Sequence, residues 1–193
     1  MPRVDPDRRT IAFKLVYCGP GMSGKTTNLV HVHRTLAAAH RGELVQLDTE
    51  EERTLFFDFF PLELGTIDGF GVRFNMYTVP GQTFYEASRR LILDGADGAV
   101  FVADSAPARL AENVESYASM QENLRSYDLD PRTFPIALQY NKRDLADAIP
   151  LGTLERTLGL PGVPVFEAVA SRGEGVLETV RDVSRRVVQR FLS

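Results

Sequence analysis

The sequence of 193 residues contains one cysteine, no tryptophan and three histidines. The lone Cys18 cannot form a disulfide within the chain, which favours a reducing compartment. It ends an apolar strand-like run, where we expect a buried, inert thiol rather than a nucleophile. His31 and His33 fall on a helix-like run and point away from each other, so we expect no histidine metal pair.

The sequence also lacks an apolar run long enough to span a bilayer. Its first ten residues, MPRVDPDRRT, have no apolar core of the kind found in a signal peptide. The C-terminal QRFLS carries no cysteine for prenylation, and Pro2 excludes N-myristoylation. We therefore expect a cytoplasmic protein with no integral membrane segment and no lipid anchor.

Positive charge is not in excess, because 22 Lys and Arg face 26 Asp and Glu, for a net charge of −4. No overall positive field draws the molecule to nucleic acid, and no nucleic-acid partner is expected. Lysine is scarce among the basic residues, and the three lysines are Lys14, Lys25 and Lys142. Two of them fall in the motifs described below, which hints that those positions need a compact ammonium.

Apolar strand-like runs alternate with helix-like runs along the whole chain. This alternation is typical of an α/β fold with a doubly wound, mainly parallel sheet and helices on both faces. We expect one domain over residues 1–193, with about residues 1–9 flexible. Ligands bind such sheets beyond the carboxyl ends of the strands. The strands are predicted at 11–18, 43–48, 66–79, 98–104, 134–141 and 163–169, and the helices at 25–39, 83–94, 107–127 and 174–192.

The first strand-to-helix loop reads GPGMSGKTT, which has the phosphate-binding pattern G-x-x-x-x-G-K-[ST] in the context that the pattern requires. Its glycines let backbone N–H groups approach phosphate oxygens closely. Lys25 is expected to reach the β- and γ-phosphates, and the Thr26 hydroxyl to bind Mg²⁺. The expected nucleotide-binding residues are Gly19, Gly21, Met22, Ser23, Gly24, Lys25, Thr26 and Thr27.

The fifth strand runs into NKRD, which favours guanine as the base. The Asp144 carboxylate can accept from the N1–H and N2–H₂ donors of guanine, whereas adenine lacks N1–H, so discrimination can approach about 10⁴-fold. Lys142 is expected to lie along the base with its head toward the phosphate loop, while Asn141 braces the loops. In EAVASRGEG the Ala170 N–H could bind guanine O6, although a small residue after a strand describes it equally well. The third loop contributes Val169, Ala170 and Ser171.

Together these residues resemble a Ras-like small GTPase. The segments GPGMSGKTTN, EERTLFFDF, YTVPGQ and NKRDL resemble more narrowly the MglA (mutual gliding motility) family of bacterial Ras-like GTPases. The resemblance implies a P-loop GTPase fold, GTP/GDP and Mg²⁺ as cofactors, and hydrolysis that is slow without an activating partner. It further implies an MglB-like roadblock-fold dimer as activating protein, effectors that read the nucleotide state, and a role in cell polarity or motility, with recruitment to a cell pole.

The resemblance also assigns catalytic roles. Gln82 follows the strand end at TVPG and is placed to orient the attacking water, and Gly81 can offer its N–H to the γ-phosphate. Gln82 could otherwise be an ordinary exposed turn residue. Arg53 is implied to be an arginine finger supplied in cis, which offsets charge on the bridging oxygen. A surface ion pair of Arg53 with a neighbouring glutamate is the alternative.

Metal binding departs from the usual Ras-like pattern, because Thr78 stands where most members carry an Asp. Asp58 is our candidate for the missing carboxylate, and Thr54 for the threonine that meets Mg²⁺ and the γ-phosphate. The predicted metal residues are therefore Thr26, Thr54 and Asp58. Two other functions stay open: a guanine-nucleotide-dependent scaffold with negligible hydrolysis, favoured if Thr78 disables Mg²⁺ handling, and a P-loop kinase for a small metabolite, which NKRD and PGQ disfavour.

Overall fold

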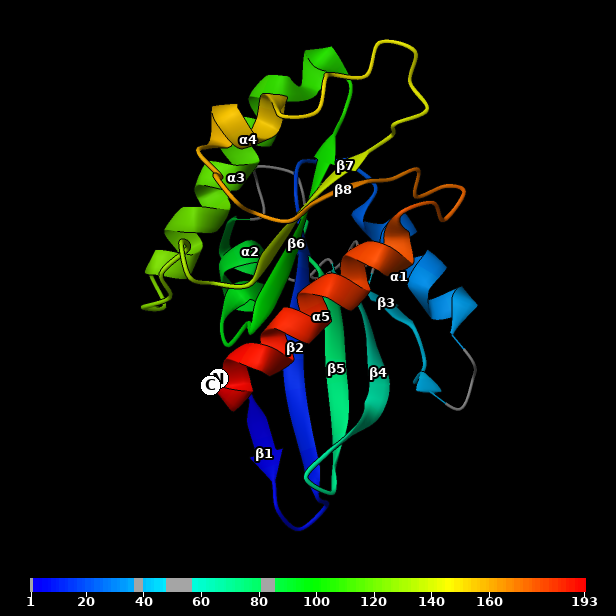
Figure 1. Cartoon of the computed structure of the whole chain (residues 1–193), viewed down its shortest axis with the longest axis vertical. Helices are drawn as coiled ribbons and strands as arrows, with labels where there is room; N and C mark the ends of the chain where they lie inside the picture. Colours follow the sequence, from blue (N-terminus) through cyan, green and yellow to red (C-terminus); the bar gives the residue numbers. More distant parts are fainter. Residues whose placement is uncertain (1, 37–39, 48–56, 81–85) are drawn as a thin grey trace.

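A computed structural model of the chain describes residues 2–36, 40–47, 57–80 and 86–193. Within them, one sheet has the strand order β3-β4-β5-β2-β6-β7-β8, and β1 pairs with β2 off this path. Figure 1 shows the sheet as a central layer with helices on both faces. The strands are β1 (Arg3–Asp5), β2 (Thr10–Cys18), β3 (Val45–Leu47), β4 (Phe57–Ile67), β5 (Phe70–Thr78), β6 (Gly98–Asp104), β7 (Ile136–Asn141) and β8 (Val165–Glu167). The helices are α1 (Lys25–Thr35), α2 (Glu86–Leu93), the 3-10 helix η3 (Pro107–Arg109), α3 (Leu110–Arg125), α4 (Thr153–Leu158) and α5 (Val176–Leu192).

The centre of the sheet is parallel, as predicted. β2 pairs in parallel with β5 on one side and β6 on the other, and β7 and β8 continue the parallel order. Every residue of β6 and β7 is buried. A parallel strand covered on both faces reads as a continuous apolar run, which is why GAVFVAD and IALQYN could be recognised from the sequence.

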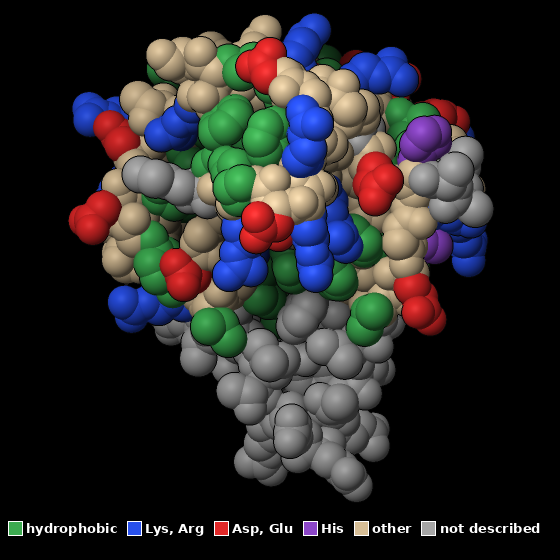
Figure 2. Space-filling model, turned by 90° about the horizontal axis from the view of Figure 1, so that it is seen from below, with side chains coloured by type: hydrophobic (Ala, Val, Ile, Leu, Met, Phe, Trp, Pro, Cys, Tyr) green, Lys and Arg blue, Asp and Glu red, His purple; other side chains and the backbone are tan. Residues whose placement is uncertain are grey.

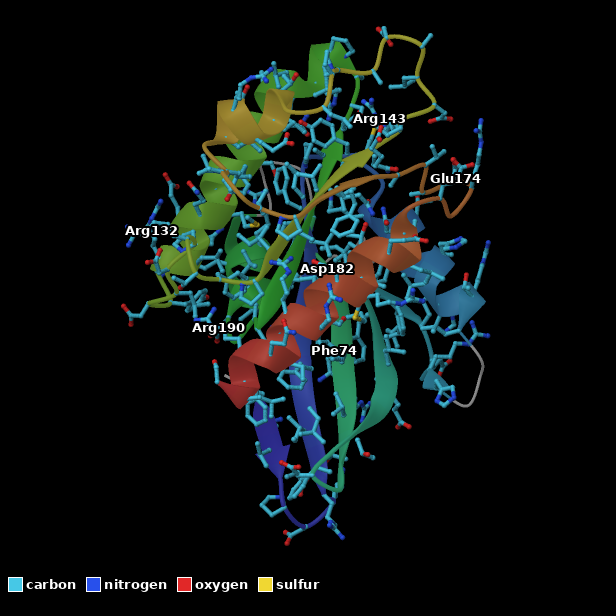
Figure 3. The ribbon with its side chains drawn as sticks, in the orientation of Figure 1. Phe74, Arg132, Arg143, Glu174, Asp182 and Arg190 are labelled. Carbon is cyan, nitrogen blue, oxygen red and sulfur yellow. The ribbon has the colours of Figure 1, made fainter. Side chains whose placement is uncertain are left out.

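Two apolar cores lie on opposite faces of the sheet. Along β2, Phe13 and Leu15 belong to the core under α1 and α5, whereas Val16 belongs to the core under α2 and α3. Side chains of a strand alternate between faces, so β2 joins both cores. The Phe13 ring stacks on that of Phe74, which lies beneath α5 in Figure 3, with 5.1 Å between centroids. The buried face of α5 includes Val176, Val180, Val183 and Val187, the helical spacing expected from the sequence.

The segment from residue 57 to 67 corrects the predicted strand boundaries. We expected a strand only from residue 66, but β4 begins at Phe57 and runs antiparallel to β5. Pro61 argues against a strand, since it cannot donate to a ladder. Its carbonyl nevertheless accepts a hydrogen bond from the Gly42 N–H at 2.8 Å, and the flanking Phe60 and Leu62 are buried in the core.

Both ends of the described chain lie near the first half of β2. Arg3 of β1 pairs antiparallel with Ala12 of β2, and the flexibility expected for residues 1–9 stays a prediction. Phe191, near the end of α5, packs edge-on against Phe13 with 5.5 Å between ring centroids. The phosphate loop follows the carboxyl end of β2, so the ends of the chain and this loop are separated along the strand (Figure 1).

The first and third predicted helices end earlier than the sequence predicted. The regular part of the first helix ends at Thr35, and the third predicted helix begins as η3 before continuing as α3. The short α4, between β7 and β8, was not predicted. No helix within the described ranges is long and apolar enough to cross a membrane. Figure 2, seen from below, shows acidic and basic side chains next to one another around a hydrophobic group, so the described residues of that face form no wide field of one sign.

Candidate nucleotide-binding site

The predicted phosphate loop joins the end of β2 to the start of α1, and two of its glycines are sterically required. Gly19 has φ +137°, and a Cβ there would lie 2.1 Å from the Val102 carbonyl oxygen. Gly24 has φ +103°, and a Cβ there would lie 2.2 Å from Asn141 Nδ2. The loop therefore packs closely on the strands beside it. It opens into a helix N-terminus, where backbone N–H groups favour an anion.

Lys25 is the buried cation of this loop. Its ammonium donates to the carbonyl oxygens of Gly19 at 3.0 Å and Pro20 at 2.7 Å. Burial lowers its pKa to about 8, with a smaller lowering by Arg89 that the Cys18 thiol and Asp58 oppose. The charged form is thus costly here, and a phosphate group would supply the counter-charge that the loop itself lacks.

The Asp58 carboxylate sits between two threonine hydroxyls. Thr26 donates to its Oδ2 at 2.6 Å, and Thr78 donates to the same oxygen at 3.0 Å. The Asp58 N–H in turn donates to the Thr78 hydroxyl at 2.9 Å, because β4 and β5 are paired at this point. A carboxylate of the neighbouring strand β4 therefore lies next to Thr26, the predicted metal ligand, and beside Thr78.

This set of oxygens suits Mg²⁺, which prefers oxygen ligands. Among the described residues, no group of three or more His, Cys, Asp or Glu could hold a metal. A cation at Thr26 and Asp58 would therefore need further oxygens from a phosphate ligand or water, which is the usual way in which Mg²⁺ binds beside nucleotides. The side-chain oxygens of Thr26 and Asp58 therefore fit a bound Mg²⁺ ion.

Asn141 braces two loops, as the sequence led us to expect. It is the last residue of β7 and is buried. Its Nδ2 donates to the Ser23 carbonyl oxygen at 2.7 Å, and its Oδ1 accepts from the Ala170 N–H at 2.9 Å. The phosphate loop, NKRD and the loop after β8 are thus held together by one side chain. Guanine O6 would have to share the Ala170 N–H with Asn141.

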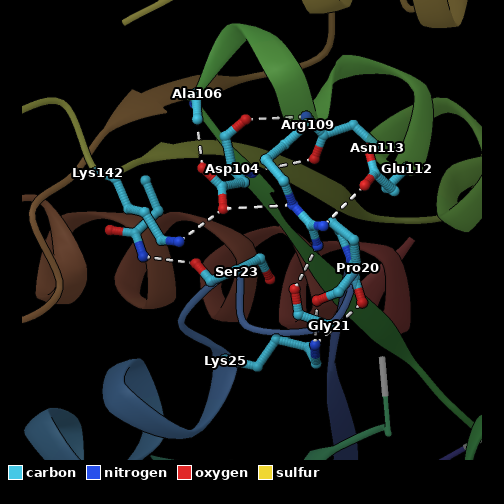
Figure 4. A network of polar contacts seen from close by, with 12 residues as sticks. Pro20, Gly21, Ser23, Lys25, Asp104, Ala106, Arg109, Glu112, Asn113 and Lys142 are labelled. Carbon is cyan, nitrogen blue, oxygen red and sulfur yellow. Dashed lines mark hydrogen bonds and ion pairs between the residues drawn. The ribbon is translucent and has the colours of Figure 1, made fainter. Parts of the chain in front are cut away.

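Two further NKRD side chains, those of Lys142 and Asp144, face partners that were not predicted. The Asp144 carboxylate lies 3.6 Å from the Arg172 guanidinium, an exposed pair at the edge of the site. The Lys142 ammonium donates to Asp104 Oδ2 at 2.6 Å (Figure 4). Lys142 also has a left-handed backbone, with φ +64°. Both side chains are nevertheless at the same edge of the sheet as the phosphate loop.

Comparison with known proteins decides the family. The chain is 47% identical over 188 residues to the mutual gliding-motility protein MglA of Myxococcus xanthus (strain DK1622), and the alignment covers 97% of this chain and 96% of that protein. The chain belongs to the MglA family. It is also 32% identical over 151 residues to Elongation factor 4 of Desulforudis audaxviator (strain MP104C), covering 75% of this chain and 23% of that protein. No protein-family model matches.

Membership of the MglA family confirms the family resemblance, and the sheet confirms the predicted Ras-like α/β fold. Predicted site residues of this MglA-family chain differ in burial. Met22 and Thr27 are exposed in the phosphate loop and the first turn of α1, and Ser171 is exposed beyond β8. Val169 is buried, and its N–H donates to the Glu174 carbonyl oxygen at 3.1 Å.

The catalytic residues predicted for this MglA-family site lie outside the described residues. These are Arg53 and Gln82, and the predicted nucleotide-binding residues Thr54 and Gly81 also lie outside the described residues. Their roles stay predictions.

The structure adds two residues that the sequence did not single out. Asp104 ends β6, and Arg109 lies in η3, from which its Nη2 donates to the Gly21 carbonyl oxygen at 2.8 Å. A signal for Asp104 was present, because it is the one charged residue of the buried run GAVFVAD and stands where that strand ends. Nothing in the sequence around Arg109 points to the phosphate loop.

Proposed function

We propose that this MglA-family chain is a molecular switch that binds GTP and GDP with Mg²⁺ and hydrolyses GTP. The observation that carries the proposal is the bracing by Asn141, which holds the phosphate loop and the loop of Asp144 at one edge of the sheet. A polyphosphate on the first loop then places its base beside the second. The identity to a protein named MglA over nearly the whole of both chains supports this reading.

In the proposed site each residue has a defined task. Lys25 exchanges its two carbonyl acceptors for phosphate oxygens, and Thr26 with Asp58 holds the metal side. Bound Mg²⁺ supplies charge neutralisation on the phosphates. Gln82 orients the attacking water, and the Arg53 guanidinium offsets the charge that develops on the bridging oxygen. Asp144 selects guanine by accepting its two donors.

The biological role follows from the relative. That relative is a mutual gliding-motility protein, and we extend to this chain a role in motility or cell polarity. GTP and Mg²⁺ would order the two switch segments, hydrolysis would release them, and effectors would read the difference. An MglB-like roadblock-fold dimer is the activating partner in this proposal, with recruitment to a cell pole by such partners.

Calorimetry on nucleotide-stripped protein tests the binding part. We expect GDP to bind at least about 10³-fold more tightly than ADP in Mg²⁺. Asp144→Asn should weaken GDP and improve xanthosine diphosphate, whose 2-oxo group replaces the donor that the carboxylate accepts. Asp147→Asn, which removes the same charge from an exposed position three residues on, is the matched control. Equal affinity for ADP and GDP would refute the assignment.

Single-turnover phosphate release tests the hydrolysis part. With a roadblock-fold activator present, Arg53→Ala and Gln82→Leu should each slow release by about 10²-fold or more. Wild-type rates in both variants would remove these residues from the mechanism. Tight GTP binding with no stimulated release by the wild-type protein would favour a guanine-nucleotide-dependent scaffold instead.

A further inference from the structure

The Asp104 carboxylate is a meeting point of two cations from separate segments (Figure 4). It ends β6 and is 2% exposed. Its Oδ2 lies 2.6 Å from the Lys142 ammonium and 3.8 Å from Arg109 Nε, and its Oδ1 accepts from the Ala106 N–H at 3.0 Å. A carboxylate as deeply buried as this must be paired, and here the pairing joins the NKRD loop to η3.

Asp104 is itself held rigidly. Its N–H donates to Asn113 Oδ1 at 3.0 Å, and its carbonyl oxygen accepts from Asn113 Nδ2 at 2.9 Å. Asn113 lies on α3 and is fully buried. These two bonds hold the Asp104 backbone in place, so its carboxylate can position its two cationic partners.

Arg109 extends this chain of contacts to the phosphate loop. Its Nη2 donates to the Gly21 carbonyl oxygen at 2.8 Å, and its Nη1 donates to Glu112 Oε1 at 2.7 Å. A planar guanidinium can donate in these separate directions at once, which a lysine ammonium on a flexible stem cannot reproduce. Lys142, Asp104, Arg109 and Gly21 thus form a continuous path from the base loop to the phosphate loop.

The carbonyl that Arg109 holds has a direct consequence for phosphate binding. In a planar trans peptide the C=O and the following N–H point in opposite directions. Fixing the Gly21 carbonyl therefore fixes the direction of the Met22 N–H, and the Asn141 bond to the Ser23 carbonyl fixes that of the Gly24 N–H. Backbone N–H groups of such loops are the donors that receive phosphate oxygens.

We propose that Asp104 and Arg109 are positioning residues that couple the base-binding loop to the phosphate loop and so set the lifetime of the bound guanine nucleotide. This inference rests on the proposed function. Without Arg109 the Gly21 peptide loses its anchor, and the Met22 N–H loses its fixed direction. Without the Asp104 charge, Arg109 and Lys142 lose their common acceptor.

The test has one measurement without nucleotide and one with it. In nucleotide-free protein, we expect Arg109→Ala and Asp104→Asn to increase amide hydrogen exchange in the peptide covering residues 19–24. In protein loaded with a fluorescent GDP analogue, both variants should release it about tenfold faster. Arg109→Lys should release the analogue more slowly than Arg109→Ala. The double variant Asp104→Asn with Arg109→Ala should release it no faster than Asp104→Asn alone.

Arg125→Ala is the matched control, because it removes the same charge from the exposed far end of α3, the helix that continues from η3. It should leave exchange and release unchanged. If Asp104 and Arg109 had a purely structural role, their substitution would lower the unfolding temperature and raise hydrogen exchange throughout β6 and α3. The change in exchange would then not be confined to the phosphate loop. That pattern, or wild-type exchange and release in Arg109→Ala, would overturn the inference.

The two measurements also separate this inference from the proposed function. If the wild-type protein retained no guanine nucleotide, the proposed function and the claimed effect on nucleotide lifetime would both fail. The exchange of residues 19–24 would still decide whether Arg109 positions the loop.

Discussion

The Thr26 hydroxyl donates a hydrogen bond of 2.6 Å to the Asp58 carboxylate, and so joins the first turn of α1 to the start of β4. The same carboxylate accepts from Thr78, at the position where most Ras-like proteins carry their own carboxylate. β4 thus supplies an acidic group beside the predicted metal ligand, although the strand that normally supplies it carries a threonine.

We predict that Asp58→Asn weakens Mg²⁺ binding while leaving the fold intact. The amide keeps an oxygen for the two threonine hydroxyls but removes the negative charge that a hydrated Mg²⁺ favours. The Mg²⁺ concentration needed for half-maximal retention of GDP should rise by about 10-fold to 100-fold. Thr78→Val, which removes a neighbour of the carboxylate but not its charge, should have a smaller effect. If the Mg²⁺ dependence of GDP retention were unchanged in Asp58→Asn, Asp58 would be excluded from the metal site.

Nucleotide binding should take up protons above pH 8. In the nucleotide-free protein, burial lowers the pKa of Lys25 to about 8, so much of its ammonium is deprotonated at pH 8.5. Phosphate binding favours the charged form and raises this pKa again, so GDP binding at pH 8.5 should take up as much as about 0.7 proton, and little at pH 6.5. Affinity for GDP should consequently fall as pH rises through this range.

Calorimetry in two buffers of different ionisation enthalpy measures this uptake. Lys14→Arg is the control, because Lys14 is a lysine of β2 whose ammonium donates to the Asp94 carbonyl oxygen and takes no part in the site. The same uptake in this variant would exclude Lys14 as the source. No buffer dependence at pH 8.5 would contradict the assignment to Lys25.

Gly24→Ala should be far more damaging than Gly159→Ala. Both glycines have positive φ, +103° and +66°, so a side chain is strained at either position. At Gly159 nothing lies within 4 Å of the added Cβ, and we expect a loss of about 1 kcal/mol in the free energy of unfolding. At Gly24 the Cβ would also displace Asn141 from the Ser23 carbonyl, so the expected loss is about 2–4 kcal/mol.

Urea unfolding of nucleotide-free protein measures the two losses. Gly24→Ala should also lose GDP binding, whereas Gly159→Ala should keep it. Equal losses in both variants would show that the contact between the phosphate loop and Asn141 contributes little.

The Cys18 thiol should be unreactive in the folded protein. Burial raises its pKa to about 12, so at pH 8 only about one thiol in 10⁴ is ionised even before access is considered. A disulfide reagent should therefore label the native protein slowly and the urea-unfolded protein rapidly. Because Cys18 directly precedes Gly19, GDP should slow the labelling further. Rapid labelling of the folded protein would contradict a buried thiol, and Cys18→Ser identifies the labelled site.

The parts of the site that could be predicted are those set by local pattern. The phosphate loop was recognisable because its backbone requires glycine at Gly19 and Gly24, and Lys25 directly follows Gly24. NKRD was recognisable because it ends a buried strand. The same holds for the valines of α5, whose spacing reports which face of the helix is covered.

The parts that could not be predicted depend on contacts distant in sequence. Lys142 and Asp104 are 38 residues apart, and Arg109 reaches across 88 residues to Gly21. Each contact follows from the order of strands in the sheet, which no local pattern specifies. The strand from Phe57 was missed for a different reason, since Pro61 signals a break that tertiary packing overrides.

The placement of the chain ends beside the first half of β2 has a practical consequence. Arg3 and Phe191 lie near Ala12 and Phe13, which is roughly 20 Å along the strand from Gly19. A fluorescent fusion or an affinity handle joined at either end would therefore project away from the GTP-facing loops. The protein could be immobilised on a sensor chip by either end with those loops still open to the solution.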